Sequence, residues 1–336
     1  MSDSPSLSFP SIRTVVFASS HFALPVINTL IQKQMLSGVI VPDPSQLHTN
    51  AGEVDGLIMQ LQQAGIPHHV VCKEKLPQIT AALDQWQGTL GIIATYPHIL
   101  PNEVTEFFTY GAFNLHGSLL PAYAGPAPLF WQIKNQESKT GVVLHKAEQK
   151  PDSGNIVFKD EFSLHPLDTI QSLGNQIALK SSDLVVKLVA SIEETGVSPE
   201  GESQQPLDKN VANAETIYAR RPEQKDVEIK CTELEAEEIS ALCRASASQS
   251  YAAYLMIKNA GINVLQATAV DYPTYGTKPG TVAVVDENEG FIICVKGGCV
   301  RLDVLANMDG VFSGAAFAER FNIDAGMQIQ ASSIAL

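Results

Sequence analysis

The feature that most restricts the fold of this chain is the alternation of strand and helix patterns over roughly the first 160 residues. Short apolar runs rich in β-branched residues predict strands at residues 13–18, 36–41, 68–71, 90–95 and 111–115. Helical spacing of apolar residues separates these runs, at residues 23–34, 53–64, 76–86 and 102–108. This order predicts an α/β fold, with a doubly wound, mostly parallel sheet of Rossmann-like type.

The pattern changes toward the carboxyl end. Two further strands at 140–147 and 155–161 precede a long helix that begins at Asp168 and runs to about Glu194. Short strands are then predicted at 262–270, 280–285, 291–295 and 299–305, with a hairpin turn at Gly297-Gly298. We therefore predict a first domain over residues 1–197, a linker over 198–213, and a small β-barrel-like domain over 214–336.

The composition argues against several classes of protein. The five cysteines form no C-x-x-C pair, so neither a zinc site nor a disulfide framework is expected, and no metal is predicted. The amino-terminal segment lacks the basic and apolar regions of a signal peptide, and no apolar run approaches the roughly 20 residues that span a bilayer. We expect a cytoplasmic protein with no membrane partner.

The segment around the fifth predicted strand carries the strongest sign of chemistry. Because side chains alternate along a strand, Asn114 and His116 face the same side at its carboxyl end, where α/β enzymes place their reacting groups. Asp152 precedes Ser153 and Gly154, so a tight turn could aim its carboxylate at a neighbour. These residue types alone also fit a structural histidine and an ordinary turn.

The order of these motifs resembles the formyltransferase family that uses 10-formyltetrahydrofolate. The family pattern is Asn-x-His, then Ser-Leu-Leu-Pro, then a glycine, and later an aspartate before a glycine. Here Asn114, His116, residues 118–121, Gly125 and residues 152–154 match it in order and spacing. The part from about Ala214 on looks like the second domain of the methionyl-tRNA formyltransferases, so the resemblance covers nearly the whole chain.

The resemblance implies a role for each matched residue. Asn114 would donate to the developing oxyanion, His116 would act in proton transfer, and Asp152 would orient the imidazole. The family's folate pocket would involve backbone and side chains at Ala94, Tyr96, Ile99, Leu100 and Lys150. Four residues would shape the loops instead of reacting, namely Ser118, Pro121, Gly125 and Gly154. The co-substrate implied is 10-formyltetrahydrofolate.

The amine that would accept the formyl group is less clear from the sequence. Lys and Arg number 22 against 36 Asp and Glu, a formal charge of −14, whereas phosphate contacts are made mainly by basic residues. Residues 34–72 contain no Lys or Arg, although the tRNA enzymes carry a basic loop there. The acceptor is therefore either a small amine, such as an amino sugar or amino-acid derivative, or Met-tRNA, which the acidic charge disfavours.

Two other functions use the same sequence features. A formyltetrahydrofolate hydrolase would need the same three polar residues and release formate. A non-catalytic or dinucleotide-binding α/β module is the third reading. It is disfavoured because residues 18–21, after the first strand, lack a G-x-G-x-x-G motif.

Overall fold

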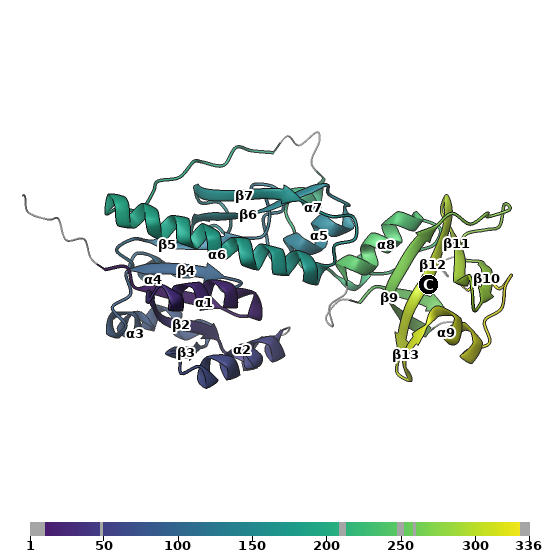
Figure 1. The fold of residues 1–336 in the computed structure, drawn as a ribbon, viewed down its shortest axis with the longest axis horizontal. Coiled ribbons are helices and arrows are strands. Elements are labelled where there is room, and N and C mark those ends of the chain that lie inside the picture. Colours follow the sequence, from purple (N-terminus) through teal and green to yellow (C-terminus); the bar gives the residue numbers. More distant parts are fainter. Residues whose placement is uncertain (1–10, 48–49, 208–212, 247–251, 258–259, 330–336) are drawn as a thin grey trace, which may run out of the picture. The chain divides into compact units, whose positions relative to one another are not determined.

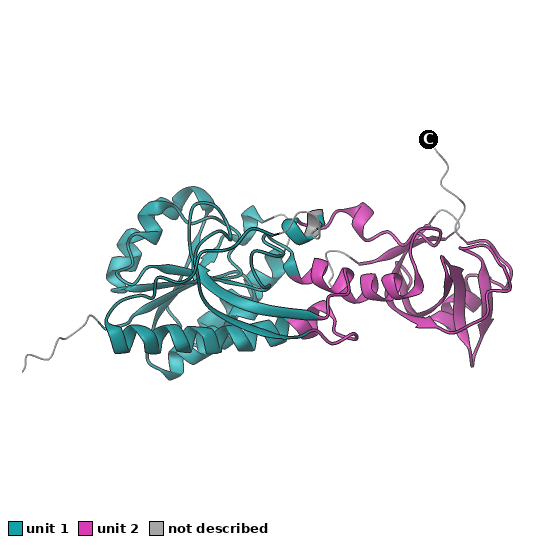
Figure 2. Cartoon of the chain, turned by 90° about the horizontal axis from the view of Figure 1, so that it is seen from above, with its two compact units in different colours: residues 1–128, 139–163, 174–220 teal, residues 129–138, 164–173, 221–336 magenta. Residues whose placement is uncertain are grey.

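The computed structural model describes residues 11–47, 50–207, 213–246, 252–257 and 260–329. The chain divides into two compact units (Figure 2). The first contains residues up to 128, 139–163 and 174–220, and the second contains 129–138, 164–173 and the residues from 221 on. Of the predicted linker at 198–213, residues 208–212 lie outside the described residues.

The first unit is built on a seven-stranded sheet with the order β3-β2-β1-β4-β5-β6-β7 (Figure 1). Pairing is parallel from β3 to β5 and antiparallel at β5–β6 and β6–β7. The predicted α/β fold with a mostly parallel sheet is therefore confirmed. The strands are β1 (Thr14–Ala18), β2 (Leu36–Pro42), β3 (His68–Val71), β4 (Leu90–Ala94), β5 (Ala112–His116), β6 (Lys139–Lys146) and β7 (Ile156–Ser163).

Helices cover both faces of this sheet. Along β1, Val16 and Ala18 pack in one buried cluster with α1, α2 and α6, while Val15 and Phe17 pack on the other face with residues of η3, α3 and α4. This alternation explains why the central strands consist almost entirely of apolar residues. The helices that precede residue 221 are η1 (His21–Ala23), α1 (Leu24–Gln32), η2 (Pro44–Gln46), α2 (Ala51–Gln63), η3 (Lys73–Gln78), α3 (Thr80–Gln85), α4 (Asn102–Thr105), α5 (Pro128–Lys134), α6 (Ile170–Thr195) and α7 (Ala214–Ile217). Of these, α5 from Leu129 on and the start of α6 belong to the second unit.

The second unit is dominated by an antiparallel sheet with the order β10-β11-β12-β9-β8, in which β13 also pairs with β12. The hairpin predicted at Gly297-Gly298 joins β11 to β12, and Gly297 adopts the positive φ of 73° that such a turn requires. The β-rich character of this part is therefore confirmed. Its elements are η4 (Gln224–Asp226), α8 (Ala236–Ala245), β8 (Tyr254–Ile257), β9 (Ala260–Val270), β10 (Val282–Asp286), β11 (Gly290–Val295), β12 (Gly298–Asn307), β13 (Gly310–Ser313) and α9 (Gly314–Arg320).

Two predicted helices differ from the structure. The helix expected at 76–86 is a 3₁₀ segment followed by the short α3, because Pro77 cannot donate a backbone hydrogen bond. The helix expected at 102–108 ends at Thr105, and the chain then turns so that the Phe108 ring packs edge-on against Phe17, with the ring centroids 6.2 Å apart. Among the described helices, none has the length and hydropathy that crossing a membrane would need.

Candidate functional site

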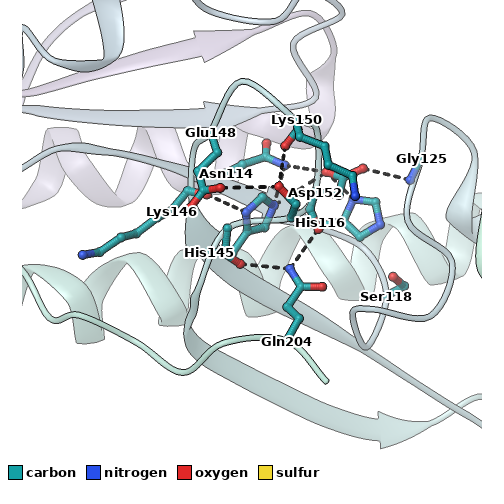
Figure 3. A network of polar contacts seen from close by, with 12 residues as sticks. Asn114, His116, Ser118, Gly125, His145, Lys146, Glu148, Lys150, Asp152 and Gln204 are labelled. Carbon is teal, nitrogen blue, oxygen red and sulfur yellow. Dashed lines mark hydrogen bonds and ion pairs between the residues drawn. The ribbon is translucent and has the colours of Figure 1, made fainter. Parts of the chain in front are cut away.

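The three residues predicted to be catalytic meet at the carboxyl end of β5 (Figure 3). Asn114 and His116 project from β5 on the same side of the sheet, and both side chains reach Asp152. Asn114 Nδ2 donates to Asp152 Oδ1 at 3.3 Å, and His116 Nδ1 lies 3.5 Å from the same oxygen. The structure thus brings the amide and the imidazole to a carboxylate that follows them in the chain by 38 and 36 residues, respectively.

A tight turn holds Asp152 in position. Asp152 has a φ of 54°, a left-handed conformation that aspartate tolerates better than most residues. A Cβ atom on Gly154 would lie 2.0 Å from the carbonyl oxygen of Lys146, so only glycine allows the turn to lie this close to β6. The other carboxylate oxygen, Oδ2, accepts from the backbone N–H of Gly125 at 2.8 Å.

A second histidine, which the sequence analysis did not single out, completes the cluster. His145 lies on β6 directly opposite Asn114 in the antiparallel pairing, and it is 2 % exposed. Its Nδ1 contacts the carbonyl oxygen of Lys146 at 2.8 Å, and only a donor can satisfy that acceptor. In the neutral ring Nε2 is therefore the acceptor, and it lies 3.0 Å from Asn114 Nδ2 and 3.6 Å from Asp152 Oδ1.

These contacts orient the Asn114 amide. Its Nδ2 atom carries two hydrogens, and its partners His145 Nε2 and Asp152 Oδ1 lie where each can accept one of them. The amide nitrogen therefore faces the interior of the cluster. In the sequence, His145 stands out only as a polar residue inside an apolar strand. The register of β6 against β5, which places His145 opposite Asn114, could not be read from the sequence.

The environment of His116 favours its neutral form. The ring is buried, and its Nε2 lies 2.9 Å from the carbonyl oxygen of Tyr123, so Nε2 carries the proton. Burial lowers the pKa of His116, and the nearby Asp152 charge opposes this effect only in part. A neutral ring leaves the Nδ1 lone pair facing Asp152, where an added proton would lie between the two groups.

The environment of Asp152 favours its charged form. Burial alone would raise the pKa of Asp152, but hydrogen bonding by His145 and the charge of His116, both acting when the rings are protonated, lower it, and so does the N–H of Gly125. The carboxylate is therefore ionised at neutral pH. A negative group next to a neutral imidazole stabilises the ring when it takes up a proton, so the pair can act in proton transfer.

The residues assigned to the folate pocket lie at the same end of the sheet. Ala94 ends β4, and the segment that follows carries Tyr96, Ile99 and Leu100, while Lys150 lies in the exposed loop before Asp152. The Tyr96 hydroxyl is buried, and among the described residues it has no hydrogen-bond partner. This placement brings the two loops to one end of the sheet.

The residues assigned to loop shape have contacts of that kind. Ser118 Oγ donates to the carbonyl oxygen of Ala122 at 2.6 Å, which closes the loop that begins at Pro121. Gly125 has a φ of 120°, and a Cβ atom there would lie 2.9 Å from the carbonyl oxygen of Ala219. Among the described residues no group of three or more His, Cys, Asp and Glu side chains could hold a metal ion.

Comparison with known families identifies this arrangement. Residues 12–189 match the family model described as formyl transferase, and residues 223–321 match the one described as formyl transferase, C-terminal domain. The chain belongs to the formyl transferase family. The resemblance inferred from the motifs around Asn114, His116 and Asp152 is thereby confirmed.

Two methionyl-tRNA formyltransferases have sequences similar to this chain. Methionyl-tRNA formyltransferase of Synechococcus sp. (strain JA-2-3B'a(2-13)) is 32 % identical over 193 residues, which are 56 % of this chain and 60 % of that protein. Methionyl-tRNA formyltransferase of Synechococcus elongatus is 23 % identical over 306 residues, which are 87 % of this chain and 91 % of that protein. In the first comparison the chain thus spans less than two thirds of its relative.

Several solved structures have a similar fold. A variant of HypX from Aquifex aeolicus has a TM-score of 0.64 at 16 % identity, over 93 % of this chain and 49 % of that one. HypX has also been solved in complex with tetrahydrofolic acid, with a TM-score of 0.59 at 17 % identity, over 92 % of this chain and 47 % of that one. An N-formyltransferase from Helicobacter canadensis, in complex with folinic acid and dTDP-3-aminofucose, has a TM-score of 0.60 at 18 % identity, over 90 % and 100 % of the two chains.

Proposed function

We propose that this protein transfers a formyl group from 10-formyltetrahydrofolate to an amine, with Asn114, His116 and Asp152 as its catalytic residues. The observation that carries the proposal is the convergence of Asn114 and His116 within 3.5 Å of one carboxylate oxygen of Asp152. Family membership supports formyl transfer, and the folate compounds bound by two structural relatives support the co-substrate.

The reaction forms a carbon–nitrogen bond between the amine and the formyl carbon and breaks the bond from that carbon to the folate nitrogen. The attacking amine loses a proton, the departing folate nitrogen gains one, and the intermediate carries an oxyanion. Asn114 supplies the donor for this oxyanion. Its longer contact, 3.3 Å to Asp152, is the one that the oxyanion replaces, while the 3.0 Å contact to His145 continues to hold the amide.

His116 takes the proton from the amine through Nε2. In the structure this nitrogen donates to the Tyr123 carbonyl, so the incoming amine replaces that carbonyl as its partner. The ring proton then resides on Nδ1 and points to Asp152, which leaves the Nε2 lone pair free to act as a base. Asp152 stabilises the imidazolium that forms, and the proton returns to the folate nitrogen.

A small amine is the acceptor that the charges favour. Residues 206–336 carry 11 Lys and Arg against 17 Asp and Glu, and a surface that binds tRNA requires the opposite balance. The dTDP-3-aminofucose bound in the Helicobacter structure supports an amino sugar as the acceptor.

Met-tRNA is the second candidate. It is supported by the methionyl-tRNA formyltransferase of Synechococcus elongatus, whose similarity extends over 87 % of this chain. The match of residues 223–321 to the C-terminal domain model supports it as well.

The proposal is tested by incubating the protein with formyl-labelled folate and a panel of acceptors, which includes amino-sugar nucleotides, amino-acid derivatives and Met-tRNA. We expect label on one of the amines. Formate release with no labelled amine would indicate a hydrolase, and folate binding without turnover would indicate a binding module. Either result would overturn the proposal.

Variants link the activity to the site. Asn114→Ala, His116→Ala and Asp152→Ala should each lower the rate of transfer by about a hundredfold or more, the scale of one polarising or acid–base group. His165→Ala is the matched control, because His165 is exposed and lies outside the cluster. Turnover by the His116 variant at the rate of this control would contradict the mechanism.

A further inference from the structure

The segment that follows α6 lies against both loops of the site. We call residues 197–207 and 213–219 the strap. Figure 1 shows its first part running from the end of α6 back past β7. Glu202 forms two backbone hydrogen bonds with Ile156 in β7, both 2.8 Å long. The sequence suggested only a connection between domains here, but the strap is hydrogen-bonded to the sheet.

One side chain of the strap holds the Asp152 turn. Gln204 Nε2 donates to the carbonyl oxygen of Asp152 at 2.8 Å and to that of Gly154 at 2.9 Å (Figure 3). A side-chain amide nitrogen has two hydrogens, so both are used on this turn. Gln204 is half-buried, which strengthens hydrogen bonds relative to those exposed to water.

This contact bears on where the carboxylate points. Asp152 is in the left-handed region, and its side-chain direction depends on the peptide units on either side of it. On one side, the turn packs so closely against the Lys146 carbonyl that there is no room for a Cβ atom on Gly154. Gln204 fixes the carbonyl groups of the turn, so the turn is held from both directions.

The second part of the strap holds the other loop. The backbone N–H of Tyr123 donates to the carbonyl oxygen of Thr216 at 2.6 Å. Ala219 forms two further backbone hydrogen bonds: its N–H donates to the carbonyl oxygen of Ala124 at 2.6 Å, and its carbonyl oxygen accepts from the N–H of Ala127 at 3.0 Å. This loop supplies the Tyr123 carbonyl that contacts His116 and the Gly125 N–H that contacts Asp152. One segment therefore fixes both loops that surround the catalytic carboxylate.

We propose that Gln204 is a positioning residue for formyl transfer, which fixes the backbone of the Asp152 turn so that the carboxylate meets His116 and Asn114. The inference rests on the proposed function, because it assigns Gln204 to the same site. Gln204 acts through Asp152 and touches no reacting atom, so its loss should lower kcat more than it raises KM for the amine.

The test compares Gln204→Met, which keeps the length but has no donor, with Gln204→Glu, which also places a negative charge beside two carbonyl oxygens. Gln205→Leu is the matched control, since Gln205 is the exposed neighbour in the strap. We expect kcat to fall by about tenfold to a hundredfold in the Met variant, and further in the Glu variant, because small misplacements of reacting groups have effects of this size.

Two readouts separate positioning from general loss of structure. The acid limb of the pH–rate profile should move to lower pH, because a displaced Asp152 no longer opposes the effect of burial on the pKa of His116. Hydrogen exchange at the Gly125 amide, which donates to Asp152, should accelerate in both variants and not in the control.

The outcomes distinguish this inference from the proposed function. If the unmodified protein transfers formyl and both Gln204 variants match the control in kcat, pH profile and exchange, the positioning role is wrong and the function stands. If no acceptor is formylated, the function fails. Exchange at Gly125 then decides whether Gln204 holds the Asp152 turn, and unchanged exchange overturns that role as well.

Discussion

Replacing Asp152 by asparagine removes one charge from the centre of the cluster and little else. The two side chains have nearly the same shape, and the asparagine oxygen can still accept from the Gly125 N–H that now bonds Oδ2 at 2.8 Å. His116 and Asn114 keep a polar neighbour at the same position. The substitution therefore isolates the electrostatic contribution of the carboxylate.

The size of the effect follows from the distance and the burial. His116 Nδ1 and Asp152 Oδ1 lie 3.5 Å apart, and the two side chains are 7 % and 11 % exposed, so salt screens them little. At an effective dielectric constant of about 20, two unit charges at this separation attract by about 5 kcal/mol. Each 1.36 kcal/mol is about tenfold in rate, so roughly several thousandfold is the upper limit for the loss of kcat, and we expect a loss between about a hundredfold and that limit.

Two measurements test this reasoning. The first is kcat for formyl transfer by Asp152→Asn relative to the unmodified protein. The second is titration of His116 by NMR, which should show its pKa falling further, because the charge that opposes the effect of burial has been removed. A variant with unchanged kcat and an unchanged His116 titration would refute the assignment of Asp152 as the partner of the imidazole.

Three further results are expected. Gly154→Ala should unfold the turn or abolish activity, because its Cβ would lie 2.0 Å from the Lys146 carbonyl oxygen; wild-type activity and an unchanged melting temperature would contradict this. The free energy of unfolding should fall as the pH drops below 6.5, because the unfolded chain then binds a proton that buried His116 takes up only at lower pH; His116→Asn should flatten that part of the curve in urea titrations. With a small-amine acceptor, kcat/KM should change little between 50 and 200 mM salt, whereas a tRNA acceptor held by 6–10 phosphate contacts should lose about a thousandfold or more.

Much of the fold could be predicted because the local hydrophobic pattern of its strands agrees with their burial in the folded chain. The strands near 13–18 and 90–95 lie within one residue of their predicted bounds, since their apolar runs are also the centre of the sheet. The edge strand at 68–71 has the predicted bounds as well. The short strands β8 and β13 were not predicted. Each has four residues, and their strand character depends on pairing with β9 and β12 more than on local sequence.

The site could be predicted in part for a related reason. Asn114 and His116 lie two residues apart on one strand, so the period of the strand places them together. The turn motif made Asp152 a candidate, and the resemblance to the formyltransferase family gave it a catalytic role. His145 and Gln204 could not be found in this way, because their positions depend on the register of β6 against β5 and on the course of the strap, and neither is encoded locally.

The most direct test of the account is a single-turnover measurement with formyl-labelled folate and the accepted amine. The label should pass from folate to the amine in the unmodified protein. In His116→Ala the step should be at least about a hundredfold slower, while folate binds with unchanged affinity. Equal rates of label transfer in the two proteins would show that the reaction does not take place at the cluster of Asn114, His116 and Asp152.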